Sequence, residues 1–380
     1  MRVTHLLLTG ALAGCSFAPQ AAGDGGRIDG AEAAVDSGSG SNIVIPPDWW
    51  DPAWAARSRI TVDNAHVVAT SLAGFPVLVT LTPGTFDYAR ARPDGGDLRF
   101  LTADGQRELP YELDTWIAQG VSLVWVGVDI PAAPADKPSL WLYYGNPRGT
   151  DDARPAALWS VDVSVHHLAT LADATGHGHT GQSLGTGTLP VPLQALVGNG
   201  MAFNGDDAAM TLAGESNYDF TTDLTVSFWL NANPFPGGQD QVFEAFVCKG
   251  DNAWRVQRDN LSEHLDFATT TDAGNINLGG THTIDDQVWH HIAVTQSNGV
   301  KTSYVDGVQD NLAMGSKAIH TSNDLVGLGK NVSVPNRFLD GTMDELRISA
   351  VAQSPTWIRA EHDTVMQPSF VVVSPPETIR

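Results

Sequence analysis

Hydrophobic and polar residues alternate along several short segments of the chain. In residues 224–231, Leu224, Val226, Phe228 and Leu230 occupy every second position, and the positions between them are mostly polar. A period of two places the two sets on opposite faces of an extended strand, so this pattern predicts a β-strand with one face in a core. Residues 289–295 are predicted to form another strand.

Turn signals separate the predicted strands. Residues 301–309 contain Asp306-Gly307 within a β-rich run, and this dipeptide tolerates the positive φ that a type I′ turn requires, so a hairpin is expected. Short strands spaced by turns suggest a two-sheet sandwich in residues 155–380. One short helix is predicted at residues 355–362, with Ser354 as its N-cap.

A separate group of short strands is predicted in residues 48–150. Residues 75–81 are rich in β-formers, and residues 121–126 and 140–144 are hydrophobic on both faces, as buried strands are. With 38 glycines and 22 prolines, the chain has many helix-breaking residues. The predicted fold class is therefore all-β, with two β-sandwich domains.

The charge balance excludes several partners. Among 380 residues, 21 are Lys or Arg and 43 are Asp or Glu, which gives a formal net charge of −22. No basic surface is available to displace counterions from phosphates, so nucleic acid is not expected as a partner. A polybasic contact with anionic lipid is excluded for the same reason.

The first residues have the order of a secretory signal. Residues 1–14 contain one arginine, then a short apolar run, then small residues, and the run is too short to span a bilayer. The end of this segment, Leu12-Ala13-Gly14-Cys15, resembles the lipobox of bacterial lipoproteins. This resemblance implies cleavage before Cys15 and acylation of Cys15, and Ser16 at the next position favours the outer membrane, on its periplasmic side or at the cell surface. A plain secretory signal with an incidental cysteine is the alternative.

Residues 15–47 are rich in Ala, Gly, Asp and Ser and predict a flexible tether. If Cys15 is lipidated, Cys248 has no partner for an intrachain disulfide, because the chain has two cysteines. Cys248 lies in an apolar stretch and is expected to be a buried, inert thiol.

Two families share ordered blocks with this chain. Residues 201–207, 224–230, 289–294, 304–307 and 341–348 resemble a laminin-G-like, concanavalin A-like jelly roll. Residues 94–100, 125–126 and 143–146 resemble an uncharacterised bacterial module, the domain of unknown function 2341, which often precedes a laminin-G-like domain. The resemblances place the first domain at residues 48–150 and the jelly roll, with a C-terminal strand, at residues 155–380.

No arrangement of residues predicts catalysis. Residues 181–185 match the G-x-S-x-G motif of serine hydrolases, but loop-like residues flank the motif where a strand and a helix are required. Asp344 and Glu345 are the nearest acidic pair in the second domain, and neighbours on a strand point to opposite faces. Motifs of the H-E-x-x-H and C-x-x-C type are absent, so zinc is not predicted.

The laminin-G resemblance implies a calcium site. Such domains often hold calcium with Asp carboxylates, and Asp206, Asp207 and Asp344 lie in two of the matching blocks. Turn capping is the alternative role for these residues. Trp254 is the candidate for stacking on a sugar ring, with a core position as the alternative.

These observations favour a membrane-anchored, non-enzymatic recognition module at the bacterial envelope. The jelly-roll resemblance implies a glycan or a cell-surface protein as the partner. A carbohydrate-active enzyme is the second hypothesis and requires two carboxyls about 5 to 9 Å apart in one cleft. A structural envelope component without a soluble ligand is the third.

Overall fold

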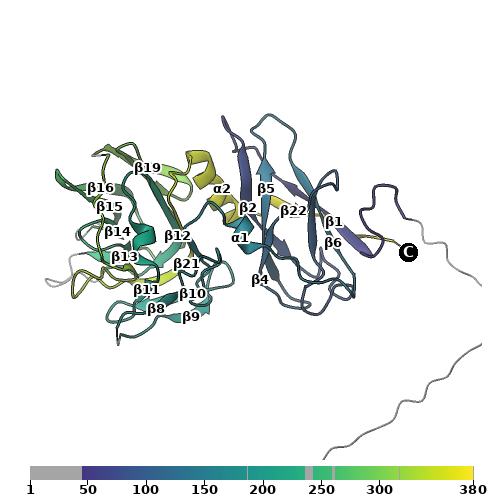
Figure 1. Ribbon diagram of the computed structural model, residues 1–380, viewed down its shortest axis with the longest axis horizontal. Coiled ribbons are helices and arrows are strands. Elements are labelled where there is room, and N and C mark those ends of the chain that lie inside the picture. Colours follow the sequence, from purple (N-terminus) through teal and green to yellow (C-terminus); the bar gives the residue numbers. More distant parts are fainter. Residues whose placement is uncertain (1–44, 186, 236–242, 259–261, 316, 380) are drawn as a thin grey trace, which may run out of the picture. The chain divides into compact units, whose positions relative to one another are not determined.

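The computed structural model describes residues 45–379, except residues 186, 236–242, 259–261 and 316. The predicted signal segment, Cys15 and the tether as far as residue 44 lie outside the described residues. The described part contains 23 β-strands and two α-helices, and all pairings between named strands are antiparallel (Figure 1). The all-β prediction is confirmed. Neither described helix has the length and hydrophobicity needed to cross a bilayer.

Two sheets form the first domain. One sheet has the order β22 (Val371–Val373), β1 (Ala56–Val62), β6 (Ser139–Tyr144) and β3 (Arg99–Thr102), with β23 (Glu377–Thr378) also paired to β1. The other has the order β2 (Leu72–Leu81), β5 (Ser122–Ile130) and β4 (Tyr111–Thr115). Buried side chains from both sheets, including Ile60, Val77 and Phe100, form one hydrophobic core.

The C-terminal strand belongs to this first domain. In the pairing of β22 with β1, Ile60 lies opposite Val373 and Val62 opposite Val371. This differs from the expectation that the second domain continues to residue 380. The physical reason is that β1 has β6 on one side only, so its other edge requires a partner, which the valine run supplies.

Two larger sheets form the second domain. The eight-stranded sheet contains β19 (Val308–Met314), β18 (Val300–Val305), β17 (His290–Ser297), β12 (Leu224–Ala232), β21 (Asp340–Ser349), β10 (Asn199–Asn204) and β9 (Val191–Gln194), with β7 (Ser164–His166) on β21. The seven-stranded sheet contains β16 (Gly274–Thr283), β15 (His264–Thr271), β14 (Trp254–Arg258), β13 (Glu244–Cys248), β20 (Val326–Leu328), β11 (Met210–Leu212) and β8 (Gly181–Ser183). A 3-10 helix at Glu215–Tyr218 lies between β11 and β12.

The local predictions in this domain agree with the structure. Alternate residues of β12, beginning with Leu224, lie in the core between the sheets. The turn between β18 and β19 has positive φ at Asp306 (52°) and Gly307 (71°), as the hairpin prediction requires. Helix α2 (Pro355–Met366) begins where predicted, and the Ser354 side chain accepts a hydrogen bond from the backbone N–H of Trp357. It continues four residues beyond the predicted end at residue 362.

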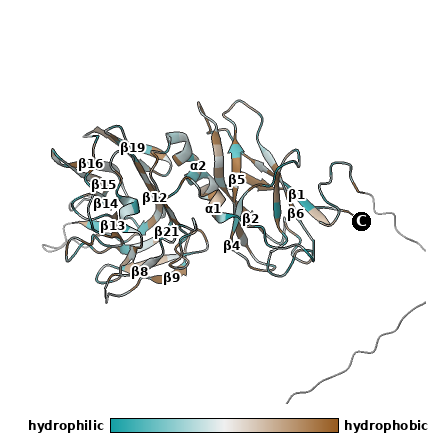
Figure 2. Cartoon of the chain, viewed as in Figure 1, coloured by the Kyte–Doolittle hydropathy of each residue, from teal (hydrophilic) through white to brown (hydrophobic). Residues whose placement is uncertain are grey.

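Strand β9 is the edge of the eight-stranded sheet, and Figure 2 shows it as a hydrophobic strand. Val191 and Leu193 are exposed there. Pro192 interrupts the row of N–H donors along this edge, which limits pairing with a further strand.

The outer face of the eight-stranded sheet is also covered. Helix α2 packs on the first domain, where the ring of Trp357 lies 4.9 Å from that of Phe75. The His362 ring, on the same helix, stacks on Trp229 of β12 at 5.7 Å. A short helix, α1 (Pro155–Leu158), connects the two domains in sequence and buries Leu158. The outer face of β12 therefore has little exposure to solvent.

Candidate functional site

Polar side chains from both domains meet where the domains contact each other. Glu112 and Asp114 come from β4, Asp344 and Glu345 from β21, and His167 directly follows β7. We call these five residues the interface cluster. Long stretches of sequence separate β4, β7 and β21, so the fold alone brings the three segments together.

His167 lies at the centre of the interface cluster. Its Nδ1 is 2.7 Å from Oε1 of Glu345, and its Nε2 is 3.2 Å from Oε2 of Glu112. The side chain is 12% exposed and that of Glu345 is 2% exposed. Burial alone lowers the pKa of His167, but the two carboxylates outweigh that effect and raise the pKa well above its usual value.

Two further carboxyls of the cluster have raised pKa values. Burial raises the pKa of Asp114 to about 7, and His167 offsets this effect only in part. Burial, together with the charge of Glu345, raises the pKa of Asp344 to about 8. Among the described residues, Oδ2 of Asp114 and Oδ1 of Asp344 have no hydrogen-bond partner. The ionised forms of both groups are therefore unfavourable in the protein alone.

A β-bulge brings Asp344 and Glu345 into the same cluster. The pairing of β12 with β21 shifts register between Ser227 and Trp229, and Glu345 has a φ of 50°. The expectation that these neighbours point to opposite faces does not hold here, because a bulge interrupts the alternation of side chains.

Aromatic rings and an arginine enclose the cluster. The guanidinium carbon of Arg347 lies 4.6 Å from the ring centroid of Trp125 and 4.9 Å from that of Trp159. The same guanidinium lies 3.5 Å from Oε2 of Glu345 and 3.5 Å from Oε1 of Glu361. This enclosed arrangement suits an ion or protons better than an organic substrate.

The cluster has donors suited to a metal ion. One ligand atom from each of Asp114, His167 and Glu345 lies within 4.8 Å of the other two. Within the part of the chain that the structure describes, this is the one such group of three or more His, Cys, Asp or Glu side chains. Sequence reasoning missed it, because no local motif links these three positions.

The three predicted calcium ligands do not converge. Asp206 and Asp207 lie on an exposed turn after β10, where Oδ2 of Asp207 accepts a hydrogen bond from Thr188. Asn204, at the end of β10, pairs with Asp340 of β21. Asp344 lies four residues further along β21, which places it roughly 13 Å from Asp340 at 3.3 Å per residue. Asp206 and Asp207 thus belong to a turn, and Asp344 belongs to the interface cluster.

Trp254 has the core position that was the alternative to sugar stacking. It is 0% exposed, and its indole N–H donates to the carbonyl of Tyr218 at 3.0 Å. Its ring stacks on that of Phe220, with centroids 6.0 Å apart and an angle of 29° between the ring planes. The prediction of a ligand-binding Trp254 is wrong, because β14 directs this side chain between the two sheets.

The second domain has a surface pocket with polar walls. It has a volume of about 590 Å³ and is lined by Pro234, Phe235, Arg258, Ser262, Glu263, His264, Thr283, Asp285 and Asp286. We call it the rim pocket. The backbone N–H of Phe235 donates to Oδ2 of Asp285 at 3.2 Å, and the Arg258 guanidinium carbon lies 3.4 Å from the centroid of the Phe235 ring. Carboxylates and an imidazole beside an aromatic ring are groups that bind sugar hydroxyls and sugar rings.

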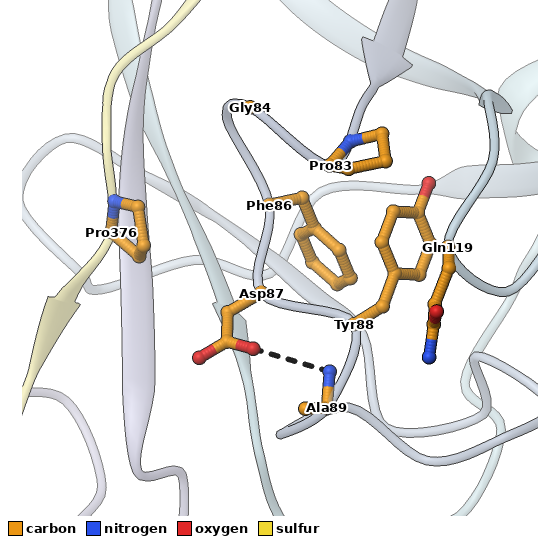
Figure 3. Close-up of a pocket in the computed structure, with 8 residues that line it drawn as sticks. All are labelled: Pro83, Gly84, Phe86, Asp87, Tyr88, Ala89, Gln119 and Pro376. Atoms are coloured by element: carbon orange, nitrogen blue, oxygen red, sulfur yellow. Dashed lines mark hydrogen bonds between the residues drawn. The ribbon is translucent and has the colours of Figure 1, made fainter.

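Figure 3 shows a second pocket, in the first domain. It has a volume of about 480 Å³, and its lining includes Phe86, Asp87, Tyr88, Gln119 and Pro376. Phe86 is 2% exposed, so its ring belongs mainly to the core. Oδ1 of Asp87 accepts a hydrogen bond from the backbone N–H of Ala89 at 3.2 Å (Figure 3).

Family comparisons agree with this architecture. The sequence model of the concanavalin A-like lectin/glucanases superfamily matches residues 204–359. The model of a domain of unknown function, DUF2341, matches residues 94–160. The chain contains a DUF2341 domain followed by a concanavalin A-like lectin/glucanase domain. A comparison of the chain with curated proteins gave no match.

Several solved structures are similar to part of this chain at low sequence identity. The binding domain of Paraclostridial Mosquitocidal Protein 1 matches with a TM-score of 0.46 and 15% identity, over 54% of this chain and 52% of that chain. The chain therefore spans about half the length of that structure. Domain 4 of a GH43 extracellular arabinanase from Geobacillus stearothermophilus, in complex with arabinotriose, matches with a TM-score of 0.43 and 19% identity, over 54% of this chain and 98% of that one. The botulinum neurotoxin serotype D ligand binding domain, in complex with N-acetylneuraminic acid, has a TM-score of 0.43 and 12% identity, over 55% and 52%.

Proposed function

We propose that the chain is a non-enzymatic module that binds glycans at the bacterial envelope. The observation that carries this proposal is the rim pocket on a concanavalin A-like lectin/glucanase domain. Glu263, His264 and Asp285 supply hydrogen-bonding groups beside the ring of Phe235. Such a set binds a polar, ring-shaped ligand through its hydroxyls and its apolar face.

Binding is favoured over hydrolysis because Glu244, the carboxyl beside the pocket whose pKa suits a general acid, is buried. The superfamily includes lectins and glucanases, and a glucanase requires a carboxylic acid that donates a proton to the scissile bond. Glu244 pairs with the pocket residue Arg258 at 3.5 Å, and burial raises its pKa to about 7, which is the range of a general acid. However, Glu244 is 1% exposed, so it cannot contact a sugar in the pocket.

We also propose that lipidation of Cys15 holds this module at the outer membrane. The support is the lipobox-like sequence that ends at Cys15. A Cys15→Ser variant is then expected in the soluble fraction of cells that retain the wild-type protein in the membrane fraction. Recovery of both proteins from the same fraction contradicts the anchor.

A glycan array tests the binding function. The purified wild-type chain is expected to bind a defined group of glycans, and Glu263→Gln and Asp285→Asn are expected to weaken that binding. Asp272→Asn is the matched control, because this substitution makes the same change of charge. The Asp272 side chain is 98% exposed and lies outside the pocket. Equal loss in the control contradicts the pocket assignment.

Two further measurements separate the alternatives. Release of shorter sugars from a bound glycan favours the carbohydrate-active enzyme, and binding to no glycan favours the structural envelope component. Parallel arrays with calcium and with EDTA test the calcium prediction. If the turn after β10 binds calcium, Asp206→Asn is expected to weaken calcium binding and with it any calcium-dependent glycan binding.

A further inference from the structure

The interface cluster holds more negative charge than the protein's own cations balance. It contains four carboxylates, while the facing cations are His167 and Arg347. Arg347 is shared with Glu361 of α2, which reduces its effect on the cluster. Buried charges without partners cost several kcal/mol each, so protons or a cation from solution must supply the missing positive charge.

Unpartnered oxygen atoms point to a cation in this position. Asp344 is 0% exposed, and its Oδ2 accepts a hydrogen bond from the backbone N–H of Val197 at 2.7 Å. Its Oδ1 has no partner among the described residues, and neither has Oδ2 of Asp114. The carboxyl of Asp344 is in the electrostatic field of Asp114, His167 and Glu345. Buried polar atoms almost always have partners, so these two oxygens are available to a ligand.

We propose that Asp114, His167 and Glu345 bind one divalent transition-metal ion, of the Zn²⁺ or Mn²⁺ kind. Their ligand atoms lie within 4.8 Å of one another. Ions of this kind bind nitrogen and oxygen at about 2.0–2.2 Å, so the ligand atoms of a tetrahedral site are about 3.4 Å apart, which the 4.8 Å limit accommodates. An imidazole together with carboxylates favours these ions over calcium, which prefers oxygen alone.

The surroundings of His167 agree with this role. Its Nδ1 faces Glu345, one of the proposed ligands, and its Nε2 faces Glu112. Binding of the ion at Nδ1 releases the Nδ1 proton to solvent, while the Nε2–H continues to donate to Glu112. A carboxylate that accepts from the second nitrogen orients a metal-binding histidine and increases its basicity.

The proposed ion joins the two domains. Asp114 belongs to β4 of the first domain, whereas Glu345 belongs to β21 of the second and His167 follows β7. An ion bound by all three stabilises the contact between the domains. This inference does not depend on glycan binding at the rim pocket.

Metal titration of the full chain tests the proposal. After EDTA treatment and dialysis, Zn²⁺, Mn²⁺ and Ca²⁺ are added separately and binding is followed by calorimetry and thermal unfolding. Zn²⁺ or Mn²⁺ is expected to bind with one ion per chain and to raise the Tm. Co²⁺ serves as a spectroscopic probe, since ligation by His167 changes its visible absorption. No binding by any transition ion overturns the proposal.

Matched variants locate the ion. Asp114→Asn and Glu345→Gln are expected to reduce affinity at least about tenfold and to alter the Co²⁺ spectrum. In EDTA, Asp114→Asn is expected to be at least as stable as the wild type, because it removes an unpartnered buried charge. Asp206→Asn, on an exposed turn, is the control and should leave transition-metal binding unchanged. If Asp206→Asn abolishes binding while Asp114→Asn does not, the ion binds elsewhere and the proposal is wrong.

Discussion

The two faces of the eight-stranded sheet are both buried, but they differ in the kinds of side chain that they carry and in the interactions that those side chains make. The inner face packs Val226, Phe228 and Ile292 against the seven-stranded sheet. The outer face carries Ser227, His291 and other polar groups, which contact α2 and the first domain. The inner face holds the domain together by removing hydrocarbon from water, whereas the outer face combines apolar contacts, such as those of Ala293 and Tyr304, with paired charges and hydrogen bonds.

This difference shows that burial alone does not identify a core. A hydrophobic side chain can be replaced by another of similar volume at small cost, because dispersion contacts have little directionality. A buried charge requires a specific partner at a specific distance, as Arg347 does with Glu345 and Glu361. The outer face is therefore the place where the molecule is most sensitive to charge, pH and ions.

The largest expected effect is a cavity on the inner face. Phe228 is 0% exposed, and Phe228→Ala is expected to lower the free energy of unfolding by about 3–5 kcal/mol. The measurement is the urea midpoint of the purified chain. Phe228→Leu is the control and should cost less, because it leaves a smaller cavity. An alanine variant as stable as the leucine variant contradicts the assignment of Phe228 to a close-packed core.

Removal of a charge from the outer face ranks second. Arg347→Met leaves Glu345 and Glu361 without their shared cation and is expected to cost about 3 kcal/mol. The double variant Arg347→Met with Glu361→Gln should recover part of that loss, because one unpaired charge is then gone. Independent, additive effects of the two changes in calorimetry are inconsistent with a direct interaction.

The third prediction concerns pH. Asp162 lies on the outer-face side near Arg347 and Glu361, and burial raises its pKa to about 8. The folded state therefore retains a proton that the unfolded state releases near pH 4, so the Asp162 contribution lowers stability as pH rises from about 4 to about 8.

The variant Asp162→Asn removes that titration. Its stability relative to the wild type is expected to increase between pH 5 and pH 8, by about 1.4 kcal/mol for each pH unit below the folded-state pKa. Urea midpoints of both proteins at the two pH values provide the test. A difference that is constant with pH shows that Asp162 titrates normally in the folded state.

The smallest expected effect is on helix α2, which covers the outer face. Ser354→Ala removes the side chain that accepts from the Trp357 N–H at 3.1 Å and is expected to cost about 1 kcal/mol. Hydrogen exchange should increase at the start of α2 more than in β12. Equal increases in both elements show that the helix and the sheet open together.

Local sequence signals predicted a substantial part of this fold. The period of two in residues 224–230, the Asp306-Gly307 turn and the Ser354 cap each depend on neighbouring residues, and each agrees with the structure. The calcium and tryptophan assignments were less successful. Whether Trp254 faces a core or a ligand depends on which side of β14 is covered, and the sequence of β14 does not specify this.

The amino-acid sequence thus specified the strands, the turns and the chain's all-β character, because alternation and turn chemistry act over a few residues. Tertiary structure alone determined that β22 pairs with β1 and that Asp114, His167 and Glu345 meet. These contacts join positions that are far apart in the chain, and a bulge at Glu345 reverses the side-chain direction that simple alternation predicts. Such placements depend on how whole sheets pack, which no local pattern encodes.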